Sequence, residues 1–249
     1  KKLSLKNKIL SSFRNKMMAY DFKNKNNSLW CENEYISQLL RKKFPGKKIH
    51  TVSNNCNQVY FDKYSWDNSI TLPKFDGFTF LTITANYPHK NLRISVDALE
   101  VLKEMYPDLN IRFVFTIKES DFGPIPEDLK DSFVFLGPIS INQCPHLYEQ
   151  ADIIFQPSLL ECFSATYPEA MLMKKPILTT DLGFAYSLCG EAACYYSADD
   201  PVVLTNTINK IVSNKNYREE LVKKGLEQIK KFDSFEIRAK KLINIITKA

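Results

Sequence analysis

Residues 153–171 read IIFQPSLLECFSATYPEAM, a short apolar run followed by a polar loop and a helical segment. The run Ile153–Gln156 is nearly continuous in apolar residues, which is typical of a strand buried on both faces of a parallel sheet. Pro168 suits the first turn of a helix, and Ser164 or Thr166 can cap its start. The stretch therefore predicts one strand–loop–helix unit of an α/β domain.

The same alternation repeats on both sides of this stretch. The other five apolar runs are Phe78–Ala85, Ile111–Ile117, Phe133–Leu136, Pro176–Thr180 and Ala193–Tyr196. Helices are predicted over Leu92–Met105, Gln143–Ala151, Tyr167–Lys174, Pro201–Ser213 and Tyr217–Lys231. This pattern predicts a doubly wound, mostly parallel six-stranded α/β sheet with Rossmann-like topology. Its ligand-binding loops are expected at the carboxyl ends of the strands.

The chain is expected to contain two parts joined by a linker. Residues 1–67 hold a basic amphipathic helix candidate, Leu5–Tyr20, but too little else for an independent α/β domain. The short elements expected there are Ser28–Cys31, Glu34–Phe44 and Ile49–Val52. We interpret these residues as the terminal part of a preceding α/β domain, followed by a linker over 68–76 and the sheet domain over 77–233. Residues 234–249 are expected to form a helix that packs back on the first domain.

Composition excludes several classes of protein. The chain has 249 residues, 44% hydrophobic and 25% charged, which is enough for a sizeable core. No apolar run approaches the roughly 18 to 20 residues that span a bilayer, and the basic start has no apolar signal-peptide core. The six cysteines form no C-x-x-C pair, so we expect reduced thiols, a cytoplasmic protein and no metal site.

The net charge of +6 is concentrated in residues 1–48. A basic surface favours anionic partners, and a merely solvated surface is an equally good interpretation. We expect a peripheral contact between the basic N-terminal helix and an anionic membrane. No nucleic-acid partner is expected, because the net positive charge is the only feature that favours one.

The first candidate site is the loop after the first long apolar run, where residues 85–91 read ANYPHKN. Lys90 is expected at the start of the next helix. The ammonium group and the free backbone N–H groups both favour phosphate there. The alternative is a polar loop that only caps the helix.

The second candidate site lies within residues 153–171. Backbone N–H groups near Ser164–Tyr167 are expected to point out of a helix start toward an anion. Glu161 precedes this helix and Glu169 lies about one turn inside it, so the two carboxylates can bind sugar hydroxyls on either side of a diphosphate. In the structural alternative, Glu169 stabilises the helix start and Glu161 is a solvated loop acid.

The third candidate is the loop Leu136–Ser140, after the third run. Gly137 and Pro138 first of all predict a turn. A flat nucleobase could also pack against such a loop.

Taken in order, these clusters resemble glycosyltransferase family 4, the group 1 glycosyltransferases with the GT-B fold. The motifs that carry the resemblance are Tyr87–Leu92, Phe135–Gly137, Leu147-Tyr148, Ala151-Asp152, Pro157–Glu161, Phe163, Glu169–Met171, Lys175–Ile177 and Gly190–Ala193. The resemblance implies a retaining enzyme that transfers a hexose from a nucleotide-diphosphate sugar to a glycan or lipid-linked acceptor in polysaccharide or glycolipid assembly.

The resemblance also implies roles for single residues. Lys90 would contact the diphosphate, and Glu169 the ribose hydroxyls. Glu161 would be the catalytic residue, positioning the donor sugar and stabilising charge. The other donor-binding residues implied are Asn86, the backbone amides of Ser164, Ala165 and Thr166, and Pro138 with Ile139 beside the base. No cofactor and no metal is implied, because Lys90 and the helix start would neutralise the leaving diphosphate.

The sequence departs from the family pattern in several places. Ala85, followed by Asn86, stands where the family usually has a second phosphate-binding arginine, unless Arg93 replaces that cation. Cys162-Phe163-Ser164 stands for the usual Gly-Phe-Gly, and residues 181–186 lack the usual paired glycines. Most of the acceptor-binding domain is expected to be absent, so these residues alone are expected to be inactive. The alternatives are a sugar-nucleotide epimerase of the same fold and a catalytically inactive nucleotide-sugar-binding module.

Overall fold

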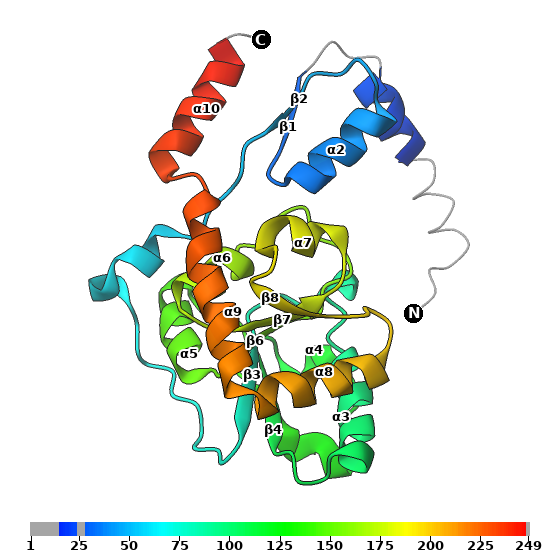
Figure 1. Ribbon diagram of the computed structural model, residues 1–249, viewed down its shortest axis with the longest axis vertical. Helices are drawn as coiled ribbons and strands as arrows, with labels where there is room; N and C mark the ends of the chain where they lie inside the picture. Colours follow the sequence, from blue (N-terminus) through cyan, green and yellow to red (C-terminus); the bar gives the residue numbers. More distant parts are fainter. Residues whose placement is uncertain (1–14, 24–27, 248–249) are drawn as a thin grey trace. The chain divides into compact units, whose positions relative to one another are not determined.

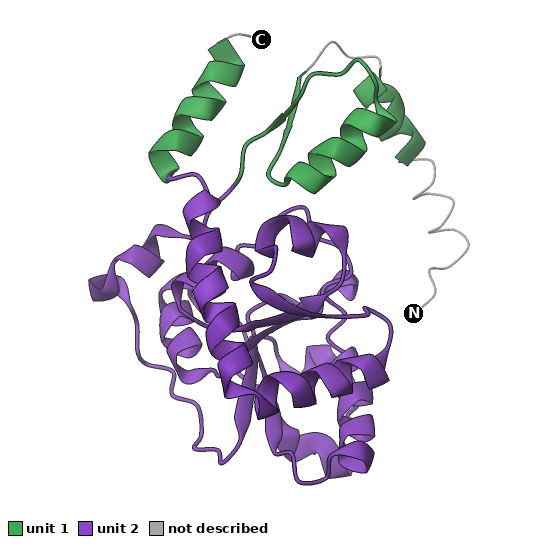
Figure 2. Cartoon of the chain, viewed as in Figure 1, with its two compact units in different colours: residues 1–53, 235–249 green, residues 54–234 purple. Residues whose placement is uncertain are grey.

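The computed structural model describes residues 15–23 and 28–247. The chain divides into two compact units (Figure 2), one formed by residues 1–53 and 235–249 and the other by residues 54–234. In the described ranges, no helix combines the length and the apolar character needed to cross a membrane.

Unit 1 contains a two-stranded parallel sheet. The strands β1 (Leu29–Cys31) and β2 (Ile49–Thr51) pair in register and are connected by α2 (Glu34–Lys43). The side chain of Asn33 caps α2 by accepting the N–H of Tyr35 at 2.9 Å. These three elements form a small β–α–β unit. The three short segments predicted here are found within a residue or two of their expected bounds.

Two further helical segments belong to unit 1. Residues 15–23 are helical, whereas the rest of the helix predicted over Leu5–Tyr20 lies outside the described residues. The last helix, α10 (Phe235–Thr247), is joined to the β1 side of the unit by an ion pair between Arg238 Nη2 and Glu32 Oε1 at 2.9 Å.

Unit 2 is built on a fully parallel sheet with the order β5-β4-β3-β6-β7-β8. The strands are β3 (Phe78–Thr82), β4 (Ile111–Phe115), β5 (Phe133–Phe135), β6 (Ile153–Gln156), β7 (Ile177–Thr180) and β8 (Ala193–Tyr196). The order reverses between β3 and β6, which makes the sheet doubly wound and places a crevice at the carboxyl ends of these two strands. The predicted fold class is confirmed.

Helices cover both faces of this sheet (Figure 1). The α-helices of unit 2 are α3 (Ile94–Met105), α4 (Glu119–Phe122), α5 (Cys144–Gln150), α6 (Thr166–Leu172), α7 (Gly183–Cys189), α8 (Pro201–Ser213) and α9 (Lys215–Gln228). The short 3-10 helices are η1 (Gln58–Phe61), η2 (Lys63–Ser65), η3 (Pro88–Lys90), η4 (Glu127–Ser132), η5 (Ile141–Gln143) and η6 (Ile229–Lys231).

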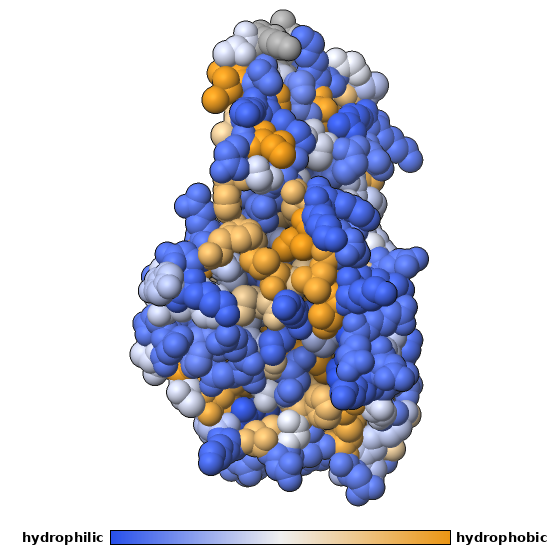
Figure 3. Space-filling view, turned by 60° about the vertical axis from the view of Figure 1, so that its left-hand side comes forward, coloured by the Kyte–Doolittle hydropathy of each residue, from blue (hydrophilic) through white to orange (hydrophobic). Residues whose placement is uncertain are grey.

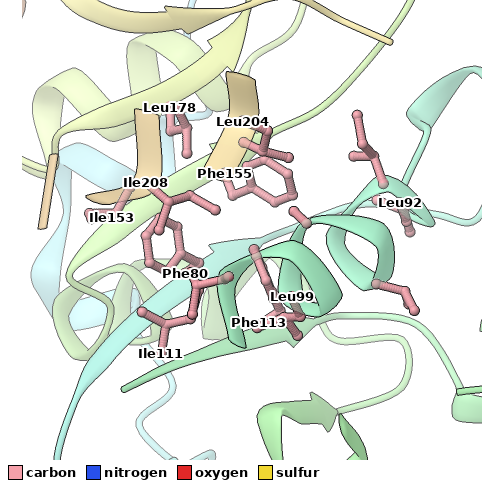
Figure 4. Packing of buried hydrophobic residues seen from close by; sticks show 14 of the residues in the cluster. Phe80, Leu92, Leu99, Ile111, Phe113, Ile153, Phe155, Leu178, Leu204 and Ile208 are labelled. Atoms are coloured by element: carbon pink, nitrogen blue, oxygen red, sulfur yellow. The ribbon is translucent and has the colours of Figure 1, made fainter. Parts of the chain in front are cut away.

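Alternating strand residues divide the core into two layers. Phe80 of β3 packs with α3 and α8 on one face (Figure 4), and its neighbour Leu81 packs with α5, α6 and α7 on the other. This two-residue period follows from the geometry of a strand, whose successive side chains point to opposite faces. Burial of both faces explains why the strand sequences are continuous apolar runs.

The segment that leads into the sheet packs on the second layer. Cys56, Val59, Tyr60 and Leu72 are buried there, together with residues of α5 and α6. The sequence analysis interpreted residues 1–67 as the terminal part of the preceding domain, with too little secondary structure for an independent domain. In the structure, the buried side chains of Cys56, Val59 and Tyr60 pack in the core of unit 2. Such packing leaves no periodic pattern in the sequence.

Apolar side chains also remain exposed on unit 2, as the orange areas in the lower part of Figure 3 show. Leu160, next to Glu161, is 63% exposed. Exposure of scattered apolar residues is normal in folded proteins, so this surface alone marks no binding site.

Candidate active site

The loops after β3 and β6 meet at the carboxyl edge of the sheet. Lys90 Nζ and Glu161 Oε1 form an ion pair at 2.5 Å, with side chains that are only 17% and 10% exposed. The backbone N–H of Leu159 donates to the carbonyl of His89 at 2.7 Å, which ties the same two loops together. The two predicted charged residues are therefore neighbours, as expected for loops that flank a topological switch point.

Gln156, the last residue of β6, supports Glu161 from below. Its Nε2 donates to Glu161 Oε1 at 3.3 Å, and also to the hydroxyls of Ser158 at 3.1 Å and Ser164 at 3.3 Å. Sequence analysis counted this residue only as a strand end. The available signal was a polar side chain that ends an otherwise apolar strand next to the candidate loop.

The sequence analysis expected Lys90 at the start of the helix α3, but the structure places it before that helix. Lys90 ends η3, and Asn91 follows in the left-handed conformation with φ 50°, so α3 begins only at Ile94. The first three N–H groups of α3 already donate to the carbonyls of Asn91, Leu92 and Arg93. The start of α3 therefore offers none of these three N–H groups to an anion, and the Lys90 ammonium remains the charged donor of this loop.

The loop after β3 is also tied to the segment after β4. The Asn86 side-chain amide donates to the carbonyl of Asp121, and Arg93 Nη1 donates to the carbonyl of Pro124 at 2.7 Å. The Arg93 guanidinium lies 5.0 Å from the ring centre of Phe122. Arg93 is thus held against this segment.

The start of α6 differs from the expected capped helix. Thr166 is the first helical residue and Ala165 occupies the N-cap, so neither the Ser164 nor the Thr166 hydroxyl caps the helix. Within the described residues, the backbone N–H groups of Ser164, Ala165 and Thr166 donate to no protein group. These three groups are open to an acceptor, whereas the N–H of Tyr167, which the sequence analysis included in the same segment, donates to the carbonyl of Ser164 at 3.3 Å.

Glu169 is buried, with 7% of the residue exposed. Its Oε2 accepts a hydrogen bond from the Tyr148 hydroxyl at 2.9 Å. Burial raises the pKa of Glu169, while the hydroxyls of Tyr148 and Tyr60 lower it again. The carboxylate therefore faces two tyrosines of the second core layer, an environment that the sequence spacing did not suggest.

A pocket of about 450 Å³ is formed in part by the loop after β3, which also carries Lys90. It is lined by residues of the segments that follow β3, β4 and β5, namely Ile83, Thr84, Ala85, Asn86, Thr116, Ile117, Asp121, Pro138, Ile139, Ile141 and Cys144. Cys144, in the pocket wall, is also an electrostatic neighbour of Glu169. The size and the mixed polar and apolar lining suit a nucleoside.

The candidate residues thus fall into two groups. Asn86, Pro138 and Ile139 line the pocket, while Lys90, Glu161 and Ser164 are linked by the hydrogen bonds of Gln156 and the ion pair. In the part of the chain that the structure describes, no group of three or more histidine, cysteine, aspartate or glutamate side chains is arranged to hold a metal ion.

Replacing Glu169 with glutamine is expected to change how stability depends on pH. Because burial raises its pKa, the folded state keeps a proton that the unfolded state loses at intermediate pH. The parent chain therefore loses stability as pH rises from the ordinary carboxyl range through the folded-state pKa. Glu169→Gln cannot ionise, so its advantage in thermal midpoint should grow between about pH 4 and pH 8. Glu100→Gln, at an exposed carboxylate of α3, serves as the control, and a difference constant across this range would contradict the expectation.

Comparison with known proteins identifies the class to which this fold and site belong. The family model of the glycosyl transferases group 1 matches residues 77–214. The chain belongs to this family. The predicted resemblance is confirmed, and the doubly wound sheet with its switch-point loops is the part of the chain that the family model covers.

One curated relative and two known structures illustrate the similarity. The O-antigen chain mannosyltransferase RfbU of Salmonella typhimurium is 25% identical over 170 residues, which cover 66% of this chain and 46% of the relative. The glycosyltransferase WaaG, involved in lipopolysaccharide biosynthesis, superposes with a TM-score of 0.74 at 15% identity, covering 98% of this chain and 70% of WaaG. Anabaena HepE, whose structure contains UDP and glucose, has a TM-score of 0.72 at 17% identity, covering 94% of this chain and 66% of HepE. The two structures show a shared GT-B glycosyltransferase fold, and the chain spans about half the length of the curated relatives it matches.

Proposed function

We propose that unit 2 binds the nucleotide-diphosphate sugar used in a retaining transfer of a hexose to a glycan or lipid-linked acceptor. The observation that carries the proposal is the Lys90–Glu161 ion pair at 2.5 Å, next to a pocket of nucleoside size and to the unpaired N–H groups at the start of α6. A cation, three amide donors and a sugar-facing carboxylate are the groups that a diphosphate sugar requires.

In this proposal, each group acts on one part of the donor. The base and ribose occupy the pocket beside Asn86, Pro138 and Ile139. The diphosphate displaces Glu161 from Lys90 and accepts hydrogen bonds from the backbone of residues 164–166. Glu161 is then free to face the sugar, where a negative charge positions the hydroxyls and stabilises positive charge that develops at the anomeric carbon.

The acceptor side of the reaction is proposed from the relatives alone. RfbU is named for O-antigen assembly, and WaaG for lipopolysaccharide biosynthesis. We therefore favour a glycan or glycolipid acceptor, a cytoplasmic reaction and a peripheral membrane contact through the basic N-terminal residues. We also propose that residues 1–67 contain the end of the acceptor-side domain.

A catalytically inactive donor-binding module is a second candidate. It is favoured by one observation: Ala85 stands at the family's arginine position, and Arg93 is held by Pro124 and Phe122. An assay of sugar transfer by the complete protein separates the two candidates, because both bind nucleotide and only the enzyme turns over.

Binding of a nucleoside diphosphate is expected to need no added metal. The Lys90 ammonium and the amides at the start of α6 are proposed to supply the positive electrostatic potential at the diphosphate. Calorimetric titration of this chain with UDP, GDP and ADP should give the same affinity with and without EDTA. Loss of binding on chelation would contradict the metal-independent mode, and no binding of any of the three would contradict the proposed function.

A further inference from the structure

Two buried tyrosines from different segments converge on Glu169. Tyr148 belongs to α5 and donates to Glu169 Oε2 at 2.9 Å. Tyr60 belongs to η1, in the segment that leads into the sheet, and its ring packs edge-on against Tyr148 with centroids 5.7 Å apart. Both residues lie in the core layer that contains α6, so the position of the carboxylate depends on two elements outside its own helix.

Tyr60 is unusual because its polar group is buried and unsatisfied. The residue is 5% exposed, and its hydroxyl forms no hydrogen bond to any described residue. The pKa of Tyr60 is raised first by burial and second by the negative charge of Glu169, so the two groups lie near each other. A buried hydroxyl without a hydrogen bond lowers the stability of the fold. Because the Tyr60 hydroxyl lies near the Glu169 carboxylate, it points to a hydrogen bond between the two that forms when ligand binds.

The other groups around Glu169 do not provide that partner. The titratable side chains that face Glu169 are Cys56, Tyr60, Cys144 and Tyr148. Several charged groups of α9 and η6, which pack against α6, are engaged with one another or with neighbours, in the contacts Lys215–Glu219, Lys224–Glu220, Lys224–Glu191, Lys230–Glu227 and Lys231–Gln228. Only the tyrosine hydroxyls are strong hydrogen-bond donors in this group, since thiols donate weakly.

We propose that Tyr60 is a positioning residue of the donor site, whose hydroxyl donates to the Glu169 carboxylate when a nucleotide occupies the pocket. The proposal rests on the function proposed above, in which Glu169 binds the ribose. With Tyr148 on one side and Tyr60 on the other, the carboxylate is fixed and stays ionised in its buried position. Its remaining lone pairs then accept the ribose hydroxyls, and the segment 54–61 becomes part of the nucleotide-binding machinery.

The test compares Tyr60→Phe with the parent and with Tyr196→Phe. Tyr196 is a matched control because its hydroxyl is also buried and unpaired, but it lies in the opposite core layer. UDP affinity is measured by calorimetry from about pH 5.5 to pH 8.5, since a hydrogen bond that Tyr60 donates in the nucleotide-bound state favours the ionised form of Glu169. The diphosphate itself ionises near pH 6, but this effect is common to all three proteins.

In the parent, affinity should fall as acid protonates Glu169. In Tyr60→Phe this fall should begin at higher pH, and affinity near pH 7 should be about tenfold weaker, within the range for a hydrogen bond to a charged group. Tyr148→Phe should shift the profile in the same direction, and Tyr196→Phe should not. Because the Tyr60 hydroxyl is unpaired without ligand, Tyr60→Phe should keep or raise the thermal midpoint of the free chain while its stabilisation by UDP decreases.

An unchanged pH profile in Tyr60→Phe, with UDP still bound by the parent, would overturn this inference and leave the proposed function standing. An equal loss of affinity at every pH would also overturn it, because a purely structural role predicts that result. If the parent binds UDP, GDP and ADP at no pH, the proposed function itself fails and the role of Tyr60 fails with it.

Discussion

Replacement of Lys90 with alanine is expected to weaken UDP binding roughly 10- to 150-fold, the range for losing a charged hydrogen bond of about 1.5 to 3 kcal/mol. Lys90 is the cation of the switch-point loops, and Arg93, the nearest alternative in sequence, is held by Pro124 and Phe122. Calorimetry on the parent and Lys90→Ala measures the effect.

This substitution also leaves the Glu161 carboxylate, 10% exposed, without its partner. An unpaired buried charge destabilises the fold, so affinity and stability must be separated. The double variant K90A/E161Q removes both charges and should recover thermal stability without recovering affinity. Lys103→Ala, which breaks an exposed ion pair with Asp128, should behave like the parent. Recovery of affinity in the double variant would show that Lys90 acts only through the fold.

Glu161→Gln is expected to lower sugar transfer while leaving UDP binding equal or tighter. In the complete protein, sugar transfer should fall by roughly 10²- to 10³-fold, as for loss of one group that stabilises charge in a transition state. UDP binding should be equal or tighter, because Lys90 is no longer neutralised by the carboxylate before the diphosphate arrives. Transfer is measured with a radiolabelled donor, and binding by calorimetry.

The matched control for this variant is Glu191→Gln, since Glu191 is an exposed acid paired with Lys224. Parallel loss of binding and transfer in Glu161→Gln would contradict a role confined to the sugar. Transfer that remains at the parent level would contradict any role of Glu161 in the reaction.

Much of the sheet could be predicted from sequence because burial on both faces leaves an unambiguous signal. Ile153–Gln156 and Ala193–Tyr196 were predicted with the bounds that β6 and β8 have. The same holds for Pro201–Ser213, where Asp200 caps α8 by accepting the N–H groups of Val202 and Val203. Turn, cap and apolar signals all agree in such elements, which makes their prediction reliable.

The elements that escaped prediction are short and owe their structure to packing. Helix α7 (Gly183–Cys189) has seven residues and begins with a glycine, so helical periodicity is weak there. Its Phe184 and Leu188 are buried in the second core layer, and this burial stabilises the helix. The 3-10 helix η1 likewise depends on Val59 and Tyr60 packing below the sheet.

For the site, the meeting of Lys90 and Glu161 could be expected from the order of their strands. The contributions of Gln156 and Tyr60 could not, because each depends on side-chain direction within the folded core. Glu169 shows the same limit: the sequence spacing predicted a carboxylate one turn inside a helix, but not that Tyr148 would hold it in a buried position.

Lys90 and Glu161 are 71 residues apart in the chain and meet because β6 pairs with β3. A growing polypeptide that has emerged from the ribosome as far as β5 contains β3, β4, β5 and the loop with Lys90. Glu161 follows β6, so it is not yet beside Lys90. Domains fold as units during synthesis, and contacts of long sequence separation form late. In the proposed function, the donor site is therefore complete only after β6 and α6 have emerged and β6 has paired with β3.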